Sequence, residues 1–273
     1  PAPLAGWKAQ EVEANAAGTG ESNNASSITL VSSLQPYPDL GVSNLSVDPA
    51  SGWTEGMPVT VRWRVANGGD APAASAWNDH VNVKNLTTGA DLANIDLRYN
   101  PAVDGELAIG GYIERSLTLT WPAGLAGIGQ LKFTVTTDGS AEIFENNAAN
   151  TAETNNTASI TVDSAPDLKV SNVRIDSSNA HAGDTITILW DDVNEGNAPA
   201  IQSYQDRVII RKRNADGSLG ATLLNALVAF PAGNLAAGQA IARQLDFHLP
   251  DGVLGAGDFE VSVTVDSSSN GVG

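Results

Sequence analysis

Oxygen-bearing side chains are concentrated in one twelve-residue segment of this chain and in a copy of that segment near the N-terminus. Calcium binds carboxylate, amide and backbone oxygens at flexible geometry, so a calcium site is one interpretation. The other, which we favour, is a polar loop whose Asn and acidic side chains bond their own backbone. The segment contains Glu145, Asn147, Asn150, Glu153, Asn155 and Asn156, and the copy contains Glu13, Asn15, Glu21, Asn23 and Asn24.

The residues that usually carry catalysis do not converge in this sequence. The three histidines, His80, His181 and His248, do not recur between the repeats described below, and none has the spacing of a zinc site. Asp191 and Asp192 are adjacent, so in a strand they would point to opposite faces, a poor arrangement for a shared acid–base site. The nucleophile elbow, the P-loop and the dinucleotide fingerprint are also missing. We therefore expect no enzymatic activity and no cofactor, with calcium as the alternative.

The charge and composition exclude several classes of partner. The 273 residues carry a formal net charge of −17, and a surface of this sign repels a phosphate backbone, so we expect no nucleic-acid partner. No apolar run approaches the roughly 20 residues that span a bilayer as a helix, so we expect no membrane insertion. The sequence contains no Cys, which excludes disulfides and thiol chemistry and fits an exported protein.

The chain contains an internal repeat. The segments PDLGVSN and PDLKVSN begin 128 positions apart, and the match continues at offsets of 127 or 128 over a whole domain length. An offset this constant indicates duplication of one domain. The aligned pairs include Asp39 with Asp167, Trp63 with Trp190, Trp77 with Tyr204, Asp79 with Asp206, and Asp138 with Asp266.

A second alignment, at an offset of 132, matches residues 11–30 with residues 143–162. We therefore expect three parts in the chain. Residues 1–33 would be the closing Asn-rich strand of a preceding or neighbouring repeat. Residues 38–165 would be a complete repeat, and residues 166–273 a repeat that lacks its closing strand.

Each repeat is expected to be an all-β, immunoglobulin-like Greek-key sandwich. Apolar and polar residues alternate in segments 59–65, 117–121 and 259–265, which places one set of side chains on one face. Turn residues such as those at 214–217 separate these runs, and no segment shows a sustained helical period. About seven short strands per repeat suit this fold. We expect the recurring Trp63 and Trp190 to pack between the two sheets.

These motifs resemble the CARDB repeat, the cell adhesion related domain found in bacteria. The resemblance rests on PDL-x-V-S-N, on V-T-V-x-W-x-V-x-N-x-G, on W/Y-x-D-x-V and on the Asn-rich closing segment after Phe-Glu. It covers nearly the whole chain, although the last repeat lacks the closing segment. It implies an immunoglobulin-like fold inside large bacterial surface or extracellular proteins, and it implies no activity.

Four further acidic residues occupy equivalent positions in the two repeats. Asp39 and Asp167 open the repeats at junctions between domains, and bacterial adhesin arrays stiffen such joints with calcium, so by analogy these two and Asp138 are further calcium candidates. Asp79 and Asp206 recur beside a strand. There we expect backbone N–H groups or an Arg to bond them, with a metal ion as the alternative.

Both ends of the chain fall at the same phase of the repeat, so a second copy joined after residue 273 would restore a whole domain. In one account, the chain is a two-domain segment of a longer covalent array of repeats. A second is a filament of separate subunits, in which the N-terminal strand of one completes the open sandwich of the next; a third is accidental truncation. The donated strand would include Glu11, Val12, Glu13, Ile28 and Leu30.

We therefore expect a structural segment of a bacterial extracellular adhesin or fibre. Its partner would be another copy of itself, head to tail, with contact to a cell surface or a glycan. The alternative is a carbohydrate-binding module or an accessory module of a secreted enzyme. Against it, four aromatic residues are scattered or belong to the expected core, whereas glycan binding needs exposed, coplanar aromatic rings. They are Trp53, Trp77, Tyr112 and Trp121.

Overall fold

The computed structural model describes residues 16–20, 24–177, 179–230 and 233–266. It divides into a unit of residues 1–35 and a unit of residues 36–273. In the first unit, residues 24–35 form neither helix nor strand. Ile28 and Leu30 in this segment are 96% and 87% exposed. A strand needs a partner for its backbone groups, so the predicted closing strand at residues 1–33 stays a prediction.

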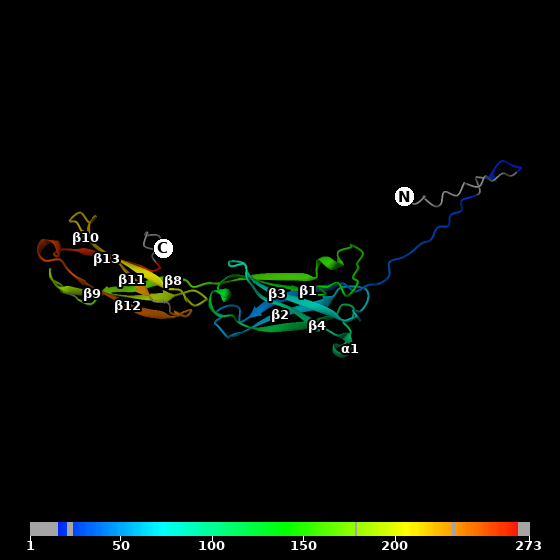
Figure 1. Cartoon of the computed structure of the whole chain (residues 1–273), viewed down its shortest axis with the longest axis horizontal. Helices are drawn as coiled ribbons and strands as arrows, with labels where there is room; N and C mark the ends of the chain where they lie inside the picture. The colour runs from blue at the N-terminus through cyan, green and yellow to red at the C-terminus, as the bar shows by residue number, and fades with distance from the viewer. Residues whose placement is uncertain (1–15, 21–23, 178, 231–232, 267–273) are drawn as a thin grey trace, which may run out of the picture. The chain divides into compact units, whose positions relative to one another are not determined.

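The second unit contains two β-sandwiches, and the first is built from seven strands in two antiparallel sheets (Figure 1). One sheet has the order β1-β2-β5 and the other β4-β3-β6-β7. The short helices α1 (Pro101–Asp104), η2 (Gly124–Gly127) and η3 (Ala152–Thr154) lie in the connections. The strands are β1 (Leu40–Asp48), β2 (Pro58–Asn67), β3 (Trp77–Asn85), β4 (Asp91–Tyr99), β5 (Tyr112–Thr120), β6 (Gly129–Thr136) and β7 (Thr157–Ser164).

The second sandwich repeats this topology with six strands among the described residues. Its sheets have the orders β12-β9-β8 and β11-β10-β13, and η4 (Gly252–Leu254) precedes the last strand. The second of these sheets therefore has three strands where its counterpart has four. The strands are β8 (Leu168–Ile175), β9 (Thr185–Asn194), β10 (Tyr204–Arg213), β11 (Leu219–Phe230), β12 (Ala240–His248) and β13 (Phe259–Thr264).

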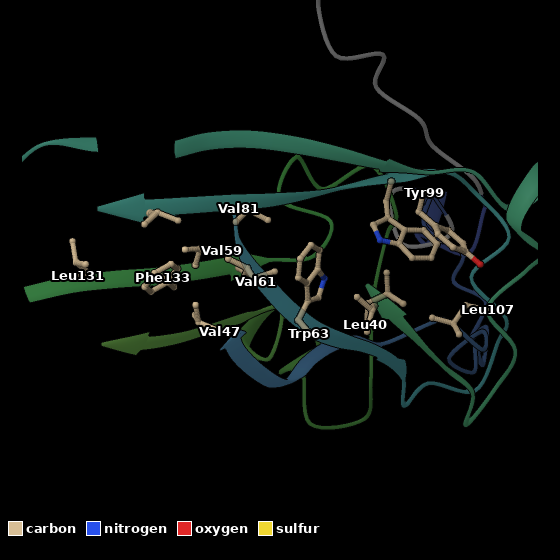
Figure 2. Packing of buried hydrophobic residues seen from close by; sticks show 14 of the residues in the cluster. Leu40, Val47, Val59, Val61, Trp63, Val81, Tyr99, Leu107, Leu131 and Phe133 are labelled. Carbon is tan, nitrogen blue, oxygen red and sulfur yellow. The ribbon is translucent and has the colours of Figure 1, made fainter. Parts of the chain in front are cut away.

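The core of each sandwich forms from the inward-facing side of these alternating strands. In β2, Val59, Val61, Trp63 and Val65 are fully buried, while the residues between them are partly or largely exposed. Figure 2 shows the Trp63 indole lying between the two sheets, beside Val59 and Val61. Trp190 is equally buried in the second sandwich. The expected inward faces and the expected tryptophan positions are confirmed.

The turn chemistry also follows the sequence. Asn214 to Gly217 joins β10 to β11, and Gly217 has a φ of 83°, which an L-residue rarely adopts. The chain is all-β with immunoglobulin-like sandwiches, as expected. Across the described ranges, no helix is both long and apolar enough to cross a membrane.

Candidate functional site

The Asn-rich segment between β6 and β7 fastens the start of β1 in the first sandwich. The Glu145 Oε2 atom accepts the Leu40 backbone N–H at 2.7 Å. Asn147 and Asn155 donate their side-chain amides to the two carboxylate oxygens of Asp39, at 2.9 and 2.8 Å. The favoured interpretation of these residues, a loop whose polar side chains satisfy backbone and one another, therefore describes most of their contacts.

Two oxygens in this loop remain without partners. Glu145 is 4% exposed, and burial raises the pKa of its carboxyl to about 8. Its Oε1 atom and the Oδ1 atom of Asn156 are buried and accept no hydrogen bond. Burial also raises the pKa of Asp138, although that carboxylate accepts the backbone N–H groups of Glu142 and Ile143. The loop thus holds two buried acceptors that could face a proton or a cation.

The described part of the second sandwich contains no counterpart of this loop and its strand. The strand β7 pairs with β6, whereas β13, the counterpart of β6, ends its sheet with an open outer edge. Leu40 is fully buried, but its counterpart Leu168 is only half-buried, and Asp167 is exposed where Asp39 is buried. The second sandwich therefore presents both an unpaired strand edge and a partly uncovered core.

The first sandwich shows what would fill this gap. Ile160 and Val162 of β7 lie opposite Phe133 and Leu131 of β6, and both pack against the buried core. At the offset of 132, their counterparts are Ile28 and Leu30. The other predicted site residues of this N-terminal copy lie outside the described residues; they are Glu11, Val12, Glu13, Glu21 and Asn23. In the first sandwich, the predicted site residue Glu153 accepts the side-chain amide of Asn156 at 3.3 Å.

A buried polar network crosses the middle of the first sandwich. Asp79 is fully buried in β3, and its Oδ2 accepts the Trp63 indole N–H at 3.0 Å and pairs with Arg115 Nε at 2.8 Å. Its Oδ1 accepts the Trp77 indole N–H at 3.0 Å and the Thr137 hydroxyl at 2.7 Å. Every carboxylate lone pair is thus used, and the expected Arg partner is confirmed.

The second sandwich changes this network by adding an acid. Asp206 again accepts the Trp190 indole and pairs with Arg243, both at 3.1 Å. The counterpart of Val65, however, is Asp192, which is fully buried and accepts the Tyr204 hydroxyl at 3.2 Å.

The two buried aspartates of the second sandwich share one arginine. The Arg243 Nε atom lies 3.8 Å from the Asp192 carboxylate, and the Oδ1 atoms of Asp192 and Asp206 have no other donor. In the first sandwich, Trp77 and Thr137 donate to the Oδ1 atom of Asp79. Their counterparts in the second sandwich are Tyr204 and Val265, so the Oδ1 atom of Asp206 lacks both of these donors. Burial raises both aspartate pKa values, and the nearby Asp192 charge adds to the increase at Asp206, whose pKa rises to about 7.

A buried asparagine holds the same turn in both sandwiches. Asn67 accepts the backbone N–H groups of Asp39 and Gly69 and donates to the carbonyls of Ala71 and Leu107. Asn194 makes the four equivalent bonds in the second sandwich. From the sequence, this asparagine could be identified only as the repeated N of the V-x-N-x-G motif. The constant Asn-x-Gly spacing in both copies is the signal that could have revealed its role.

Catalytic and glycan-binding groupings are not formed. His80 contacts Asp96, His181 contacts Asp184 and His248 contacts Thr185, each at the surface. Among the described residues, no three His, Cys, Asp or Glu side chains gather as a metal cluster. Trp53, Trp77 and Trp121 are buried core residues, so they offer no exposed platform for a sugar.

One protein family model and two solved structures are similar to part of this chain. A model of the CARDB family matches residues 37–160. A crystal structure of a CARDB domain from Pyrococcus furiosus in complex with di-metal ions is similar at 18% identity, with a TM-score of 0.34, over 49% of this chain and 98% of that one. A solution NMR structure of the CARDB domain of the same P. furiosus protein gives 18% identity and a TM-score of 0.33, over 48% of this chain and 98% of that one. No curated protein matches the chain.

CARDB is a non-catalytic, adhesion-related family associated with cell-surface proteins. The first sandwich of this chain, with its β7 strand and Asn-rich loop, is a CARDB domain.

Proposed function

We propose that this chain is a structural unit of a bacterial extracellular adhesin or fibre, and that it assembles head to tail by strand donation. In this assembly, residues 11–31 of one copy lie along the open edge of β13 in the next copy. Main-chain hydrogen bonds would give the affinity, and alternate side chains would set the register. Two observations carry the proposal: β13 pairs with no further strand on its outer edge among the described residues, and residues 25–32, which repeat the β7 sequence, form no strand.

The exposure of apolar side chains is consistent with this assembly. Ile28 and Leu30 are largely exposed in the first unit, and Phe259, Val261 and Val263 of β13 are only half-buried. Pairing would remove both sets of apolar groups from water. Because donor and acceptor lie on different surfaces, the contact is heterologous and would propagate rather than close into a dimer.

The test compares two substitutions on the same donor segment. By the register of β7, Ile28 faces the core and Thr29 faces outward. We expect the unmodified chain to form species that grow with protein concentration in sedimentation velocity, and filaments in negative-stain images. Ile28→Asp should leave a monomer, whereas Thr29→Asp should assemble like the unmodified chain.

Two results would reject the proposal. A chain that stays monomeric at every concentration would leave a covalent array as the account of the repeats. Equal loss of assembly in both variants would show that the contact does not use the β7 register. Denaturing electrophoresis distinguishes a non-covalent polymer of 28.1 kDa chains from a covalent one.

Calcium binding at the Asn-rich loop is a second proposal, favoured by the two unpaired oxygens of Glu145 and Asn156. A bound calcium ion would require the Glu145 carboxylate, whose pKa is raised to about 8 by burial, so binding near pH 7 should release a proton. Calorimetry in two buffers of different ionisation enthalpy measures that release. Glu145→Gln should abolish binding, and absence of heat with the unmodified chain would end this proposal.

A further inference from the structure

The two sandwiches differ most at the end of the core where β6, or its counterpart β13, begins. In the first sandwich, Trp53 is 1% exposed and packs on Trp121 and Phe133, with ring centroids at 4.5 and 5.7 Å. The three rings close this end of the core. A backbone hydrogen bond in the turn after Trp53 gives the alignment with the second sandwich. The Met57 N–H donates to the Thr54 carbonyl, and the Asp184 N–H donates to the His181 carbonyl in the same way.

That match aligns Trp53 with Ala180, and the domain offset aligns the other two rings with Leu249 and Val261. All three aromatic side chains are thus replaced by smaller ones. The result is an apolar pocket of about 340 Å³ in the second sandwich, which we call the Ala180 pocket. Its apolar lining includes Ile175, Ala180, Ile186, Leu249, Phe259 and Val261.

The Ala180 pocket lies beside the open strand edge. Phe259 and Val261 belong to β13, and Ile175 ends β8. In the first sandwich, Val162 of β7 lies opposite Leu131, and Ile160 lies opposite Phe133. The counterparts of Leu131 and Phe133 in the second sandwich are Phe259 and Val261. A donated strand in that register would bring Leu30 opposite Phe259 and Ile28 opposite Val261.

We propose that the Ala180 pocket is the receptor for the Leu30 side chain of a second copy of this chain. The inference rests on the proposed strand donation and adds its specificity-determining contact. Ile28 repeats Ile160 unchanged, but Leu30 replaces Val162 with a larger side chain. Phe259 is itself larger than its counterpart Leu131, but the neighbouring positions Ala180, Leu249 and Val261 have lost aromatic rings, so the pocket that they line has space for the larger side chain of Leu30.

The test uses full chains with matched leucine substitutions. Leu30→Ala should raise the protein concentration needed for half-assembly by about tenfold or more, because a buried leucine leaves a cavity when it is truncated. Leu34→Ala is the control, since Leu34 is also exposed but lies beyond the segment that matches β7. Sedimentation velocity over a concentration series measures the difference.

The acceptor side is tested by Ala180→Trp, which restores the first sandwich's residue and fills the pocket. We expect it to weaken assembly by about tenfold and to remove the further effect of Leu30→Ala in the double variant, because both changes act on one contact. If wild-type chains assemble but Leu30→Ala behaves like Leu34→Ala, the pocket assignment is overturned while strand donation stands. If wild-type chains do not assemble, both are overturned. If Ala180→Trp fails to fold by near-ultraviolet circular dichroism, the leucine pair alone decides.

Discussion

At the residue scale, the buried aspartates show how a few substitutions change the chemistry of a network that occurs twice within a single chain. Asp79 uses all its acceptor capacity on four donors, one of which is its ion-pair partner Arg115. Asp192 and Asp206 share Arg243, and one arginine cannot neutralise two buried carboxylates. The pair must therefore retain a proton, which links the stability of the second sandwich to pH.

The sign of that link follows from the raised pKa. An unfolded aspartate titrates near pH 4, whereas Asp206 in the folded state titrates at about 7. The folded state thus binds more protons between these values, and the free energy of unfolding falls as pH rises from about 4 to about 7. Asp192→Val with Tyr204→Trp removes the second buried acid and restores one of the two donors that Asp206 lacks. We expect it to flatten this fall and to stabilise the second sandwich at pH 8 by on the order of 2 kcal/mol.

Urea unfolding monitored from pH 4 to pH 8 measures this effect. The control is Asp191→Val, because Asp191 is adjacent but bonds Asn172 at the surface. A pH profile unchanged in the double variant would show that the Asp192–Asp206 pair does not set it.

A second residue-scale prediction concerns Asn67, whose side chain makes four bonds to the backbone. Asn67→Ala leaves buried backbone groups without partners and should destabilise the first sandwich by about 2–4 kcal/mol. Asn94→Ala, at an exposed position of β4, should change the unfolding free energy by less than about 0.5 kcal/mol. Equal effects of the two changes in chemical denaturation would contradict the assigned role.

At the element scale, the closed end of the first core depends on three rings from separate connections and strands. Trp53→Ala removes the ring that covers Trp121 and Phe133 and should cost about 3–5 kcal/mol. It should also open a pocket like the one beside Ala180. Tyr112→Ala is the control, because Tyr112 is 57% exposed. A small, equal loss for both in thermal unfolding would mean that the core can collapse around the gap.

The same scale shows what could be predicted from the sequence. Period-two alternation identified β2 and β13, because the side-chain period of a strand is visible in any half-buried segment. It correctly placed Asp191 and Asp192 on opposite faces. It could not bring Asp192 and Asp206 together, because β9 and β10 belong to different sheets, and the way in which two sheets face each other appears only after folding. Likewise, Ala180 is an unremarkable residue until Trp53 is seen to occupy the equivalent space.

At the scale of the whole molecule, the repeated domains make strand donation testable within one chain. Residues 10–33 fused after residue 273 through a flexible linker would offer the second sandwich its own closing strand. We expect this fusion to remain monomeric at concentrations where the unmodified chain assembles, because an intramolecular strand has a high effective concentration. Sedimentation velocity and the melting temperature of the second sandwich provide the measurements.

The control fusion carries Ile28→Asp and Leu30→Asp in the appended copy alone. It should assemble as the unmodified chain does, because its appended strand cannot cover the core. If both fusions stay monomeric, the added segment blocks assembly by bulk rather than by completing the sheet.

The position of β1 and β7 in the first sandwich has a mechanical consequence. The chain enters this domain at Leu40 and leaves it after Ser164, and each of these end strands is held by a ladder of antiparallel backbone bonds to its neighbour. Those bonds run perpendicular to the strands, so tension applied along the chain loads them together in shear rather than opening them one after another. The Asn-rich loop adds a clamp at the point where the pull begins, through Glu145 at Leu40 and the two amides at Asp39. Such a domain is suited to bear a load applied between its two ends.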